Sequence, residues 1–320
     1  MRARRIAVAR ALFEAGGQPV SGEALASELG ISRAAVGKHV AALREAGFVI
    51  ESTHHTGHRL VKMSSVSLPE AVAPLVTASL WVRFEGGATV ASTSDDAKRL
   101  ASGGAPEGTV VVAARQESGR GRLGRSWESP EGGAYFSAVL RPNVAPAAVS
   151  SLALVIALGV ATGLASLGVD TKVKWPNDVL LDGRKLVGVL LEMSAEADRV
   201  EWVVVGVGIN VRRPKGDAGG FAYVADVAAG IGPAQVAAAA LDGISVAYRR
   251  YAAEGFAGLA ADYAQLDAVR GRDVAVRDAT GAVVASGIAG GVDESGRLIV
   301  GETPVFSGEV TLRDGTGGEA

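Results

Sequence analysis

Arginine and glycine alternate in one short stretch of the chain, Gly119–Trp127, which reads GRGRLGRSW. The glycines disfavour a stable helix or strand there, and the three arginines carry permanent positive charge. Such a segment can close over an anionic ligand. A solvated basic turn or a nucleic-acid-binding arm would have the same composition, so its function depends on what the rest of the chain places beside it.

A lysine follows a predicted hairpin turn further along the chain. Asp182-Gly183 stands between two apolar runs and predicts a tight turn that places Leu180 opposite Lys185. Lys185 then lies one step inside a mostly apolar strand. It could bind an anion there, or it could simply mark the solvent-exposed end of the strand.

Two further stretches could contact a ligand. Ser92-Thr93-Ser94 precedes a helix predicted over 95–101. Hydroxyls and free amide groups there can bind a polar or anionic group, although helix capping explains one hydroxyl equally well. Gly206 and Gly208 lie in a strand predicted over 203–211. They lack the third glycine and the following helix of a dinucleotide-binding motif, so we expect them to admit a ligand close to the sheet.

Composition excludes several kinds of chemistry. The chain has no cysteine, and its four histidines all lie within residues 1–65. Disulfides, thiolate metal sites and cysteine nucleophiles are therefore excluded. Beyond residue 65 a Ser-His-Asp triad is excluded as well, and a zinc site is disfavoured. The lack of cysteine agrees with a cytoplasmic location.

The first 65 residues form a basic head on an acidic body. They hold nine lysines and arginines against five acidic residues, net +4, whereas the remainder carries net −6. Apolar spacing predicts three helices: over 6–13, after Ser21 and after Ser32. A hairpin is predicted from 48–50 and 58–61. Two helices joined by a tight turn and followed by a hairpin are typical of a winged helix-turn-helix.

Two functions remain open for this head, namely DNA binding and the protein binding that many small helical domains perform. The turn and the segregation of charge agree, so we favour DNA binding. Phosphate contacts would come from Arg33, Lys38, His39, His58 and Arg59. One winged helix contacts few base pairs, so specific recognition would require a dimer on a two-fold symmetric site.

The body is predicted to contain a sheet and a long apolar helix. Strands are expected over 80–84, 110–114 and 135–140, with further helices between 233 and 265. The uncharged run over 149–169 is interrupted by serine, threonine and glycine, which favours a buried core helix over a membrane span.

The composition changes after residue 270. Short strands separated by glycines are predicted at 274–276, 283–288, 298–300 and 310–312. Their regular spacing indicates a small SH3-like barrel, which could assist the body or serve only as a structural cap. Residues 315–320 are expected to be disordered.

Four motifs together resemble those of a known enzyme family. Residues 119–127, 174–178 (KWPND), 183–188 (GRKLVG) and 206–210 (GVGIN) are similar, in order and spacing, to motifs of the biotin protein ligases. With the winged head, nearly the whole chain resembles the bifunctional members that also repress biotin-synthesis genes. The resemblance implies an α+β multidomain fold. It has a winged helix-turn-helix DNA-binding domain at 1–63, a linker at 64–74, a class II synthetase-like α/β mixed-sheet catalytic domain at 75–269 and an SH3-like C-terminal β-barrel at 270–320.

The resemblance also implies a two-step reaction. Biotin and ATP would give biotinyl-5′-adenylate, and the biotinyl group would then pass to a lysine of a biotin carboxyl carrier protein, a subunit of acetyl-CoA carboxylase. Mg²⁺ would bridge the ATP phosphates. Lys185, Arg120 and Arg122 would be catalytic, because they would stabilise the negative charge of the transition state.

Binding residues follow from the same resemblance. Biotin would contact Ser92, Thr93, Ser94, Gln116, Gly119, Arg120, Gly121, Arg122, Lys185 and Gly188. ATP and the adenylate would contact Arg120, Arg122, Trp127, Lys174, Asn177, Lys185 and Asn210. Asp178 would help to bind Mg²⁺. DNA would contact Gly22, Ser32, Ala34 and Ala35 in addition to the five phosphate-binding residues.

Two positions depart from the pattern of the family. Ser94 stands where the family commonly has asparagine, and the shorter side chain weakens the expected contact. Leu123 replaces what is often another basic residue.

Regulation is implied as well: the adenylate would order loops, favour a homodimer and so improve operator binding. The alternatives are a biotin-sensing repressor without ligase activity and a lipoate-type acyl ligase. Retention of Lys185 with the arginines disfavours the first. The KWPND segment and the winged head disfavour the second.

Overall fold

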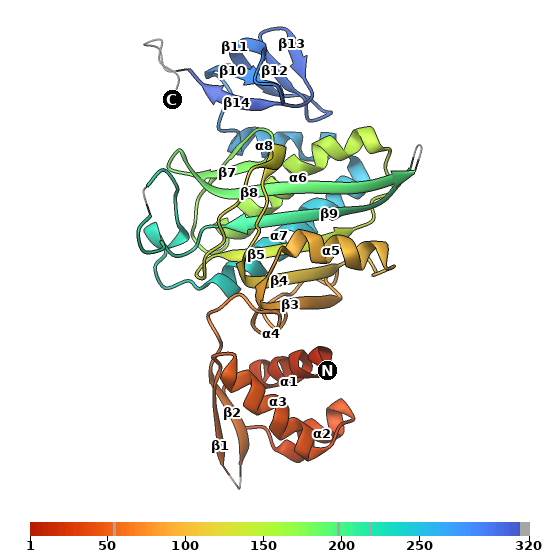
Figure 1. The fold of residues 1–320 in the computed structure, drawn as a ribbon, viewed down its shortest axis with the longest axis vertical. Helices are drawn as coiled ribbons and strands as arrows, with labels where there is room; N and C mark the ends of the chain where they lie inside the picture. Colours follow the sequence, from red (N-terminus) through yellow and green to blue (C-terminus); the bar gives the residue numbers. More distant parts are fainter. Residues whose placement is uncertain (54–55, 197–198, 218, 314–320) are drawn as a thin grey trace.

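The computed structural model describes residues 1–53, 56–196, 199–217 and 219–313. A helical head, a central sheet with its helices and a small C-terminal sheet follow one another along the long axis of the molecule (Figure 1). The expectation of disorder at 315–320 lies outside the described residues.

The head has three helices followed by an antiparallel hairpin, as predicted. Its elements are α1 (Arg2–Glu14), α2 (Gly22–Leu29), α3 (Arg33–Glu45), β1 (Val49–Thr53) and β2 (Gly57–Lys62). Both predicted caps are confirmed. The Ser21 hydroxyl accepts a hydrogen bond from Ala24 N at 3.0 Å, and the Ser32 hydroxyl accepts one from Ala35 N at 3.1 Å.

Helix α1 fastens the head to the body. Beside it lies the short helix α4 (Pro69–Val72), whose Glu70 is only 5% exposed. The guanidinium groups of Arg2 and Arg5 lie 3.8 and 3.4 Å from the Glu70 carboxylate. Arg2 also pairs with Glu85 of the central sheet at 2.8 Å. The head therefore rests on the body through charged contacts.

The central sheet has seven strands in the order β3-β4-β5-β9-β8-β7-β6. Strands β3 and β4 run parallel and all other neighbours antiparallel, which confirms a mixed sheet. The strands are β3 (Arg83–Val90), β4 (Thr109–Gln116), β5 (Ala134–Leu140), β6 (Lys172–Lys174), β7 (Asp178–Leu181), β8 (Arg184–Glu196) and β9 (Arg199–Ile209).

One predicted strand is wrong in its bounds. The strand expected over 80–84 begins only at Arg83. Trp81 instead packs in the core with its indole Nε1 donating to Leu241 O at 2.9 Å. The residues before Arg83 are thus held by the helical layer, which local apolar spacing could not reveal.

Helices cover both faces of the sheet. On one face, Ala97 and Ala101 of α5 (Thr93–Ser102) pack against Val111 of β4. The neighbours of Val111 in that strand point into the main core, which also contains α6 (Val149–Ala165) and α7 (Pro233–Glu254). Short helices complete the body: η1 (Arg122–Gly124), η2 (Pro146–Ala148), η3 (Val224–Asp226), η4 (Phe256–Leu259) and α8 (Ala260–Leu266).

The long apolar helix belongs to the core, as predicted. Residues Pro146–Ala165 are long and apolar enough to cross a membrane, with a mean hydropathy of 2.1, but 72% of the apolar window is buried inside the fold. Helices α6 and α7 approach so closely that a Cβ on Gly163 would lie 2.1 Å from Ala239 O. The apolar surface of α6 is therefore mostly buried against the rest of the protein.

The C-terminal domain is an antiparallel sheet in the order β13-β12-β11-β10-β14. Its strands are β10 (Asp273–Arg277), β11 (Val283–Val292), β12 (Leu298–Val300), β13 (Thr303–Val305) and β14 (Glu309–Leu312). The four predicted strands are present. The three-residue β13 was missed because it contains Pro304, which is unusual within a strand. No closed barrel is found within the described residues.

Candidate active site

The segment Gly119–Trp127, here called the arginine loop, connects β4 to β5 and is held by its own backbone. Gly121 N donates to Arg125 O at 2.7 Å, and Trp127 N donates to Gly119 O at 2.9 Å. A Cβ on Gly119 would lie 2.3 Å from Trp127 O, so only glycine fits there. The loop thus has a defined shape, from which each of its three arginine side chains reaches a different set of neighbours.

Lys185 lies where the hairpin prediction placed it. Leu180 pairs with Lys185 across the Asp182-Gly183 turn, which confirms the predicted register. The Lys185 ammonium lies 2.7 Å from Asp178 Oδ1 and 5.4 Å from the centroid of the Trp127 ring. Its side chain is 33% exposed, so it is accessible to a ligand.

The glycines of β8 and β9 make room for groups of the protein itself. A Cβ on Gly188 would lie 2.7 Å from the Trp127 ring, and one on Gly208 would lie 2.5 Å from Trp127 Nε1. A Cβ on Gly206 would meet the Ser94 hydroxyl at 2.7 Å. We expected these glycines to admit a ligand, but in this structure Trp127 and Ser94 occupy the space above them.

Arg122 brings the arginine loop to the corner of the sheet that carries Lys185. Its Nη1 donates to Asn177 Oδ1 at 3.0 Å and to Gly308 O of the C-terminal domain at 3.3 Å. Both acceptors are uncharged. Burial lowers the pKa of the Arg122 guanidinium, while the charges of Glu309 and Asp178 act in the opposite direction. A partly buried cation with neutral contacts is stabilised when an anion binds beside it.

Both ends of the Asn177 side-chain amide form hydrogen bonds within the protein. It accepts from Arg122, and its Nδ2 donates to Val189 O at 2.7 Å. Without a ligand Asn177 supports Arg122, and its contact with ATP stays a prediction. Among the described residues, the side chains of Asn210 and Lys174 have no hydrogen-bond or ion-pair partner, so both are free to bind a ligand.

A chain of hydroxyl groups runs from the start of α5 into the sheet, and we call it the hydroxyl chain. Thr93 donates from N and Oγ1 to Gln116 Oε1 at 2.8 and 3.0 Å. Ser137 Oγ donates to Thr93 Oγ1 at 2.8 Å and lies 3.1 Å from Ser94 Oγ. Gln116 Nε2 donates to Ser129 Oγ at 2.8 Å. The structure therefore brings Thr93, Ser94 and Gln116 together, as predicted.

The prediction missed Ser129 and Ser137 of this chain. Ser137 is fully buried in β5. A serine inside the apolar run AYFSAVL was a signal that could have been used, because a buried hydroxyl requires a partner. Ser92, by contrast, caps α5 by accepting from Asp95 N at 3.4 Å, which is the structural alternative stated for it.

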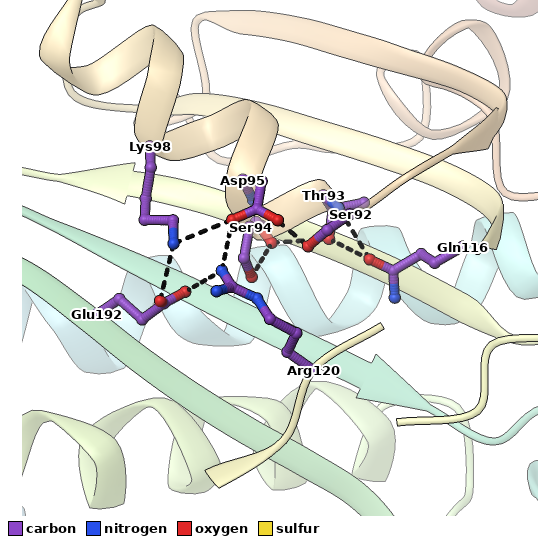
Figure 2. A network of polar contacts seen from close by, with 9 residues as sticks. Ser92, Thr93, Ser94, Asp95, Lys98, Gln116, Arg120 and Glu192 are labelled. Atoms are coloured by element: carbon purple, nitrogen blue, oxygen red, sulfur yellow. Dashed lines mark hydrogen bonds and ion pairs between the residues drawn. The ribbon is translucent and has the colours of Figure 1, made fainter. Parts of the chain in front are cut away.

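Arg120 points toward α5 and β8 and contacts two carboxylates, Asp95 at 2.7 Å and Glu192 at 2.9 Å (Figure 2). Lys98 contacts the same two carboxylates, at 3.0 and 2.9 Å. Sequence reasoning did not find Lys98 or Glu192. They are distant from Arg120 in sequence, and only the packing of α5 on the sheet brings them together.

The charged residues predicted to contact DNA differ in their surroundings. Arg33 and Lys38 are exposed and have no ion-pair partner among the described residues. Arg59 pairs with Glu51 at 2.6 Å. His58 lies 2.6 Å from the Ser52 hydroxyl, and its pKa is lowered by burial and then by Arg44 and Arg33. His39 is half-buried, and its pKa is lowered by burial and then chiefly by Arg5. Both histidines therefore favour the neutral form in the ligand-free protein, and their phosphate contacts stay a prediction.

Comparisons with known proteins match both the head and the central sheet domain to families. The sequence profile of the "Biotin/lipoate A/B protein ligase family" matches residues 86–210, and that of an "HTH domain" matches residues 4–59. The chain is 32% identical over 313 residues to the bifunctional ligase/repressor BirA of Escherichia coli (strain K12), a match that covers 93% of this chain and 94% of that protein.

Two further similarities extend this result. The bifunctional ligase/repressor BirA of Bacillus spizizenii is 41% identical over 207 residues, and this chain spans only 64% of the length of that relative. The solved structure of a biotin protein ligase from Aquifex aeolicus in complex with biotin and ATP has a TM-score of 0.61 at 29% identity. It covers 73% of this chain and 99% of its own.

Proposed function

This chain belongs to the family of bifunctional biotin ligases and repressors, and we propose that it activates biotin with ATP and transfers it to a lysine of a carrier protein. In the first step the biotin carboxylate attacks the α-phosphorus of ATP and pyrophosphate leaves. In the second, the lysine amine of a biotin carboxyl carrier protein attacks the acyl carbon, and AMP leaves. Activation is needed because a carboxylate has no good leaving group of its own.

The observation that carries this proposal is the meeting of Lys185 and Arg122 at the Asn177–Asp178 corner of the sheet. Attack by one anion on another requires positive charge that holds both and stabilises the transition state. Lys185 is accessible and next to Asp178, while Arg122 is partly buried against neutral oxygens. Arg120 was expected in the same role, but it lies between two carboxylates.

The hydroxyl chain supports a biotin site beside these cations. Biotin would contact Ser92, Thr93, Ser94 and Gln116, together with the backbone at Gly119, Gly121 and Gly188. The Trp127 ring lies over Gly188 and Gly208 at this site. Its buried Nε1 has no hydrogen-bond partner among the described residues. A ligand that moves the ring or offers an acceptor would relieve this cost. Asn210 and Lys174, whose side chains have no partner in the described parts of the chain, would contact ATP.

Mg²⁺ would be bound mainly through the ATP phosphates. Within the described ranges, no group of three histidine, aspartate or glutamate side chains could hold a metal ion. Asp178 is one carboxylate near Lys185, and Mg²⁺ sites commonly use one or two carboxylates plus substrate phosphates. The donor set thus fits an ion that arrives with ATP, where it would neutralise phosphate charge.

The domain boundaries follow from these assignments. We place the DNA-binding domain at 1–63, the linker at 64–74, the class II synthetase-like catalytic domain at 75–269 and the C-terminal domain at 270–320. The five-stranded C-terminal sheet is compatible with an open SH3-like barrel. Its contacts through Gly308 and Glu309 to the arginine loop support a role in ATP and carrier binding.

Regulation would use the head. Exposed Arg33 and Lys38 on α3, with Gly22, Ser32, Ala34 and Ala35 around them, would contact operator DNA. We propose that the adenylate-bound chain forms a homodimer in the cytoplasm and binds a two-fold symmetric operator. An adenylate-dependent gel shift of such a DNA site supports this, and an affinity that adenylate leaves unchanged contradicts it.

The ligase proposal is tested with purified chain, Mg·ATP, labelled biotin and a carrier domain. We expect label on the carrier, and none on a carrier whose acceptor lysine is replaced by arginine. Absence of label would favour the alternative of a biotin-sensing repressor. Labelling by lipoate but not by biotin would favour a lipoate-type ligase.

A further inference from the structure

The two arginines on either side of Gly121 lie in different electrostatic surroundings. Arg120 Nη2 lies 2.7 Å from Asp95 Oδ1 and 2.9 Å from Glu192 Oε2. Among the described residues, Arg122 donates hydrogen bonds to the neutral oxygens of Asn177 and Gly308 and makes no direct ion pair, although the charges of Glu309 and Asp178 lie near enough to act on it. The charge of Arg120 is therefore compensated within the protein, whereas that of Arg122 is open to an anionic ligand.

Lys98 closes the contacts of Arg120 into a ring. Its ammonium lies 3.0 Å from Asp95 Oδ1 and 2.9 Å from Glu192 Oε1 (Figure 2). Burial lowers the pKa of Lys98, but hydrogen bonds to Glu192 and Asp95 outweigh this and raise it, so Lys98 stays charged. Arg120, Asp95, Lys98 and Glu192, here called the charge ring, thus alternate in sign and carry no net charge.

The charge ring joins three separate parts of the body. Asp95 and Lys98 belong to α5, Glu192 belongs to β8, and Arg120 belongs to the arginine loop. Asp95 directly follows Ser94 of the hydroxyl chain. The contact from Thr93 to Gln116 lies beside it (Figure 2). The charge ring therefore fixes the first half of the arginine loop next to the proposed biotin pocket.

We propose that Arg120 is a positioning residue, and that Asp95, Lys98 and Glu192 hold it so that the arginine loop encloses the biotin pocket. This rests on the proposed ligase function and sharpens it. If Arg120 moved to a phosphate, Lys98 would remain with two carboxylates, and this net negative charge would lie near an anionic ligand. The balanced ring disfavours that movement. Arg122 and Lys185 then supply the charge at the phosphate.

A double-mutant cycle tests the assignment, with Arg120→Gln, Glu192→Gln and the double variant. In adenylate formation we expect each single variant to raise KM for biotin about fivefold, since the pairs are one-quarter to one-half exposed. We expect kcat to change little. The double variant should be no worse than the poorer single variant, because Arg120→Gln already removes the ion pair between Glu192 and the arginine loop.

A second readout uses the ligand-free protein. Amide hydrogen exchange over residues 117–128 should be faster in each variant. Arg120→Lys should restore part of the protection. Asp96→Asn is the matched control, because Asp96 lies next to Asp95 on α5 but, within the part of the chain that the structure describes, pairs with Arg99 alone, at 2.8 Å. It should leave both KM and exchange unchanged.

Three results would overturn the assignment: a loss of kcat in Arg120→Gln of a hundredfold or more, single effects that multiply in the double variant, or unchanged exchange in the loop. The first would make Arg120 a catalytic residue. If the wild-type chain makes no adenylate, the proposed function fails. Exchange in the ligand-free protein then still decides whether the charge ring holds the loop.

Discussion

The body of this molecule carries a separate domain on each side in sequence, and both are attached through arginines. On the head side, Arg2 and Arg5 contact Glu70 and Glu85, none of which belongs to the arginine loop. On the C-terminal side, Arg122 and Arg125 of the arginine loop itself contact Gly308 and Glu309. Arginine contacts thus join the head to α4 and β3, away from the proposed active site, and join the C-terminal domain to the arginine loop of that site.

This difference separates the two proposed activities. A change at the head contact should alter how the head is held while the arginine loop keeps all its partners. A change at the C-terminal contact should reach ligation directly. The contacts also differ in burial. Glu70 has a side chain that is 6% exposed, whereas Arg125 and Glu309 are 65% and 32% exposed. Burial makes the head contact the more costly one to break.

The largest effect on activity is expected from a substitution within the body itself, at neither domain contact. Lys185→Ala should slow adenylate formation by about 100- to 1,000-fold, because one group that stabilises transition-state charge is lost. The measurement is the single-turnover rate with biotin and Mg·ATP. Lys172→Ala is the control, since the ammonium of Lys172 donates to Gln265 O, has no ion-pair partner among the described residues and lies outside the site. A Lys185→Ala rate within threefold of wild type would remove Lys185 from the mechanism.

The head contact is the next largest. Glu70→Ala leaves Arg5 without its carboxylate partner, and we expect a cost of about 1–3 kcal/mol in the docking of α1. Proteolysis within residues 64–74, which include α4, should become faster while adenylate formation stays unchanged. Glu28→Ala, at an exposed position of α2, is the control. Equal loss of ligation would show that the head contact does reach the active site.

The C-terminal contact should give a smaller effect on the other activity. Glu309→Gln removes an exposed bidentate pair worth about 0–1 kcal/mol, so kcat/KM for ATP should fall by up to about fivefold. The contact of Arg122 with Gly308 O remains. Asp293→Asn, which breaks a pair with Arg297 inside the same domain, should have no such effect. If it does, general loosening of that domain is the cause.

The smallest effect is expected on the pH dependence of the stability of the head. The pKa values of His39 and His58 are lowered by burial and by nearby arginines, so the folded head binds protons less readily than the unfolded head. Their contribution to stability is present above pH 6.5, the ordinary value, and is lost as pH falls from 6.5 toward the lowered values. NMR titration of the head should give both midpoints below 6.5. Midpoints above it contradict the burial seen here.

Local features of the sequence predicted much of this fold. Serine caps and apolar spacing predicted the helices of the head, and the Asp182-Gly183 turn fixed the partner of Lys185. These features depend on residues close in sequence, where turn chemistry and periodicity apply.

Long-range partners could not be obtained in this way. Glu192 and Glu309 meet Arg120 and Arg125 across separations of 72 and 184 residues. Nothing near Glu192 in the sequence distinguishes it from any other glutamate within a strand such as β8. Only the order of the strands and the docking of the C-terminal sheet bring these carboxylates to the arginine loop. The motifs indicated a candidate site, but the ion-pair partners of its arginines could be found only from the tertiary structure.

The central claim is that the Lys185–Arg122 corner joins biotin to AMP. It is tested most directly by mixing the full chain with labelled biotin and Mg·ATP, without carrier or DNA, and separating the products after acid quench. We expect biotinyl-5′-adenylate in an amount comparable to the chain, with release of pyrophosphate. No adenylate from folded wild-type chain at saturating biotin and ATP would contradict the account.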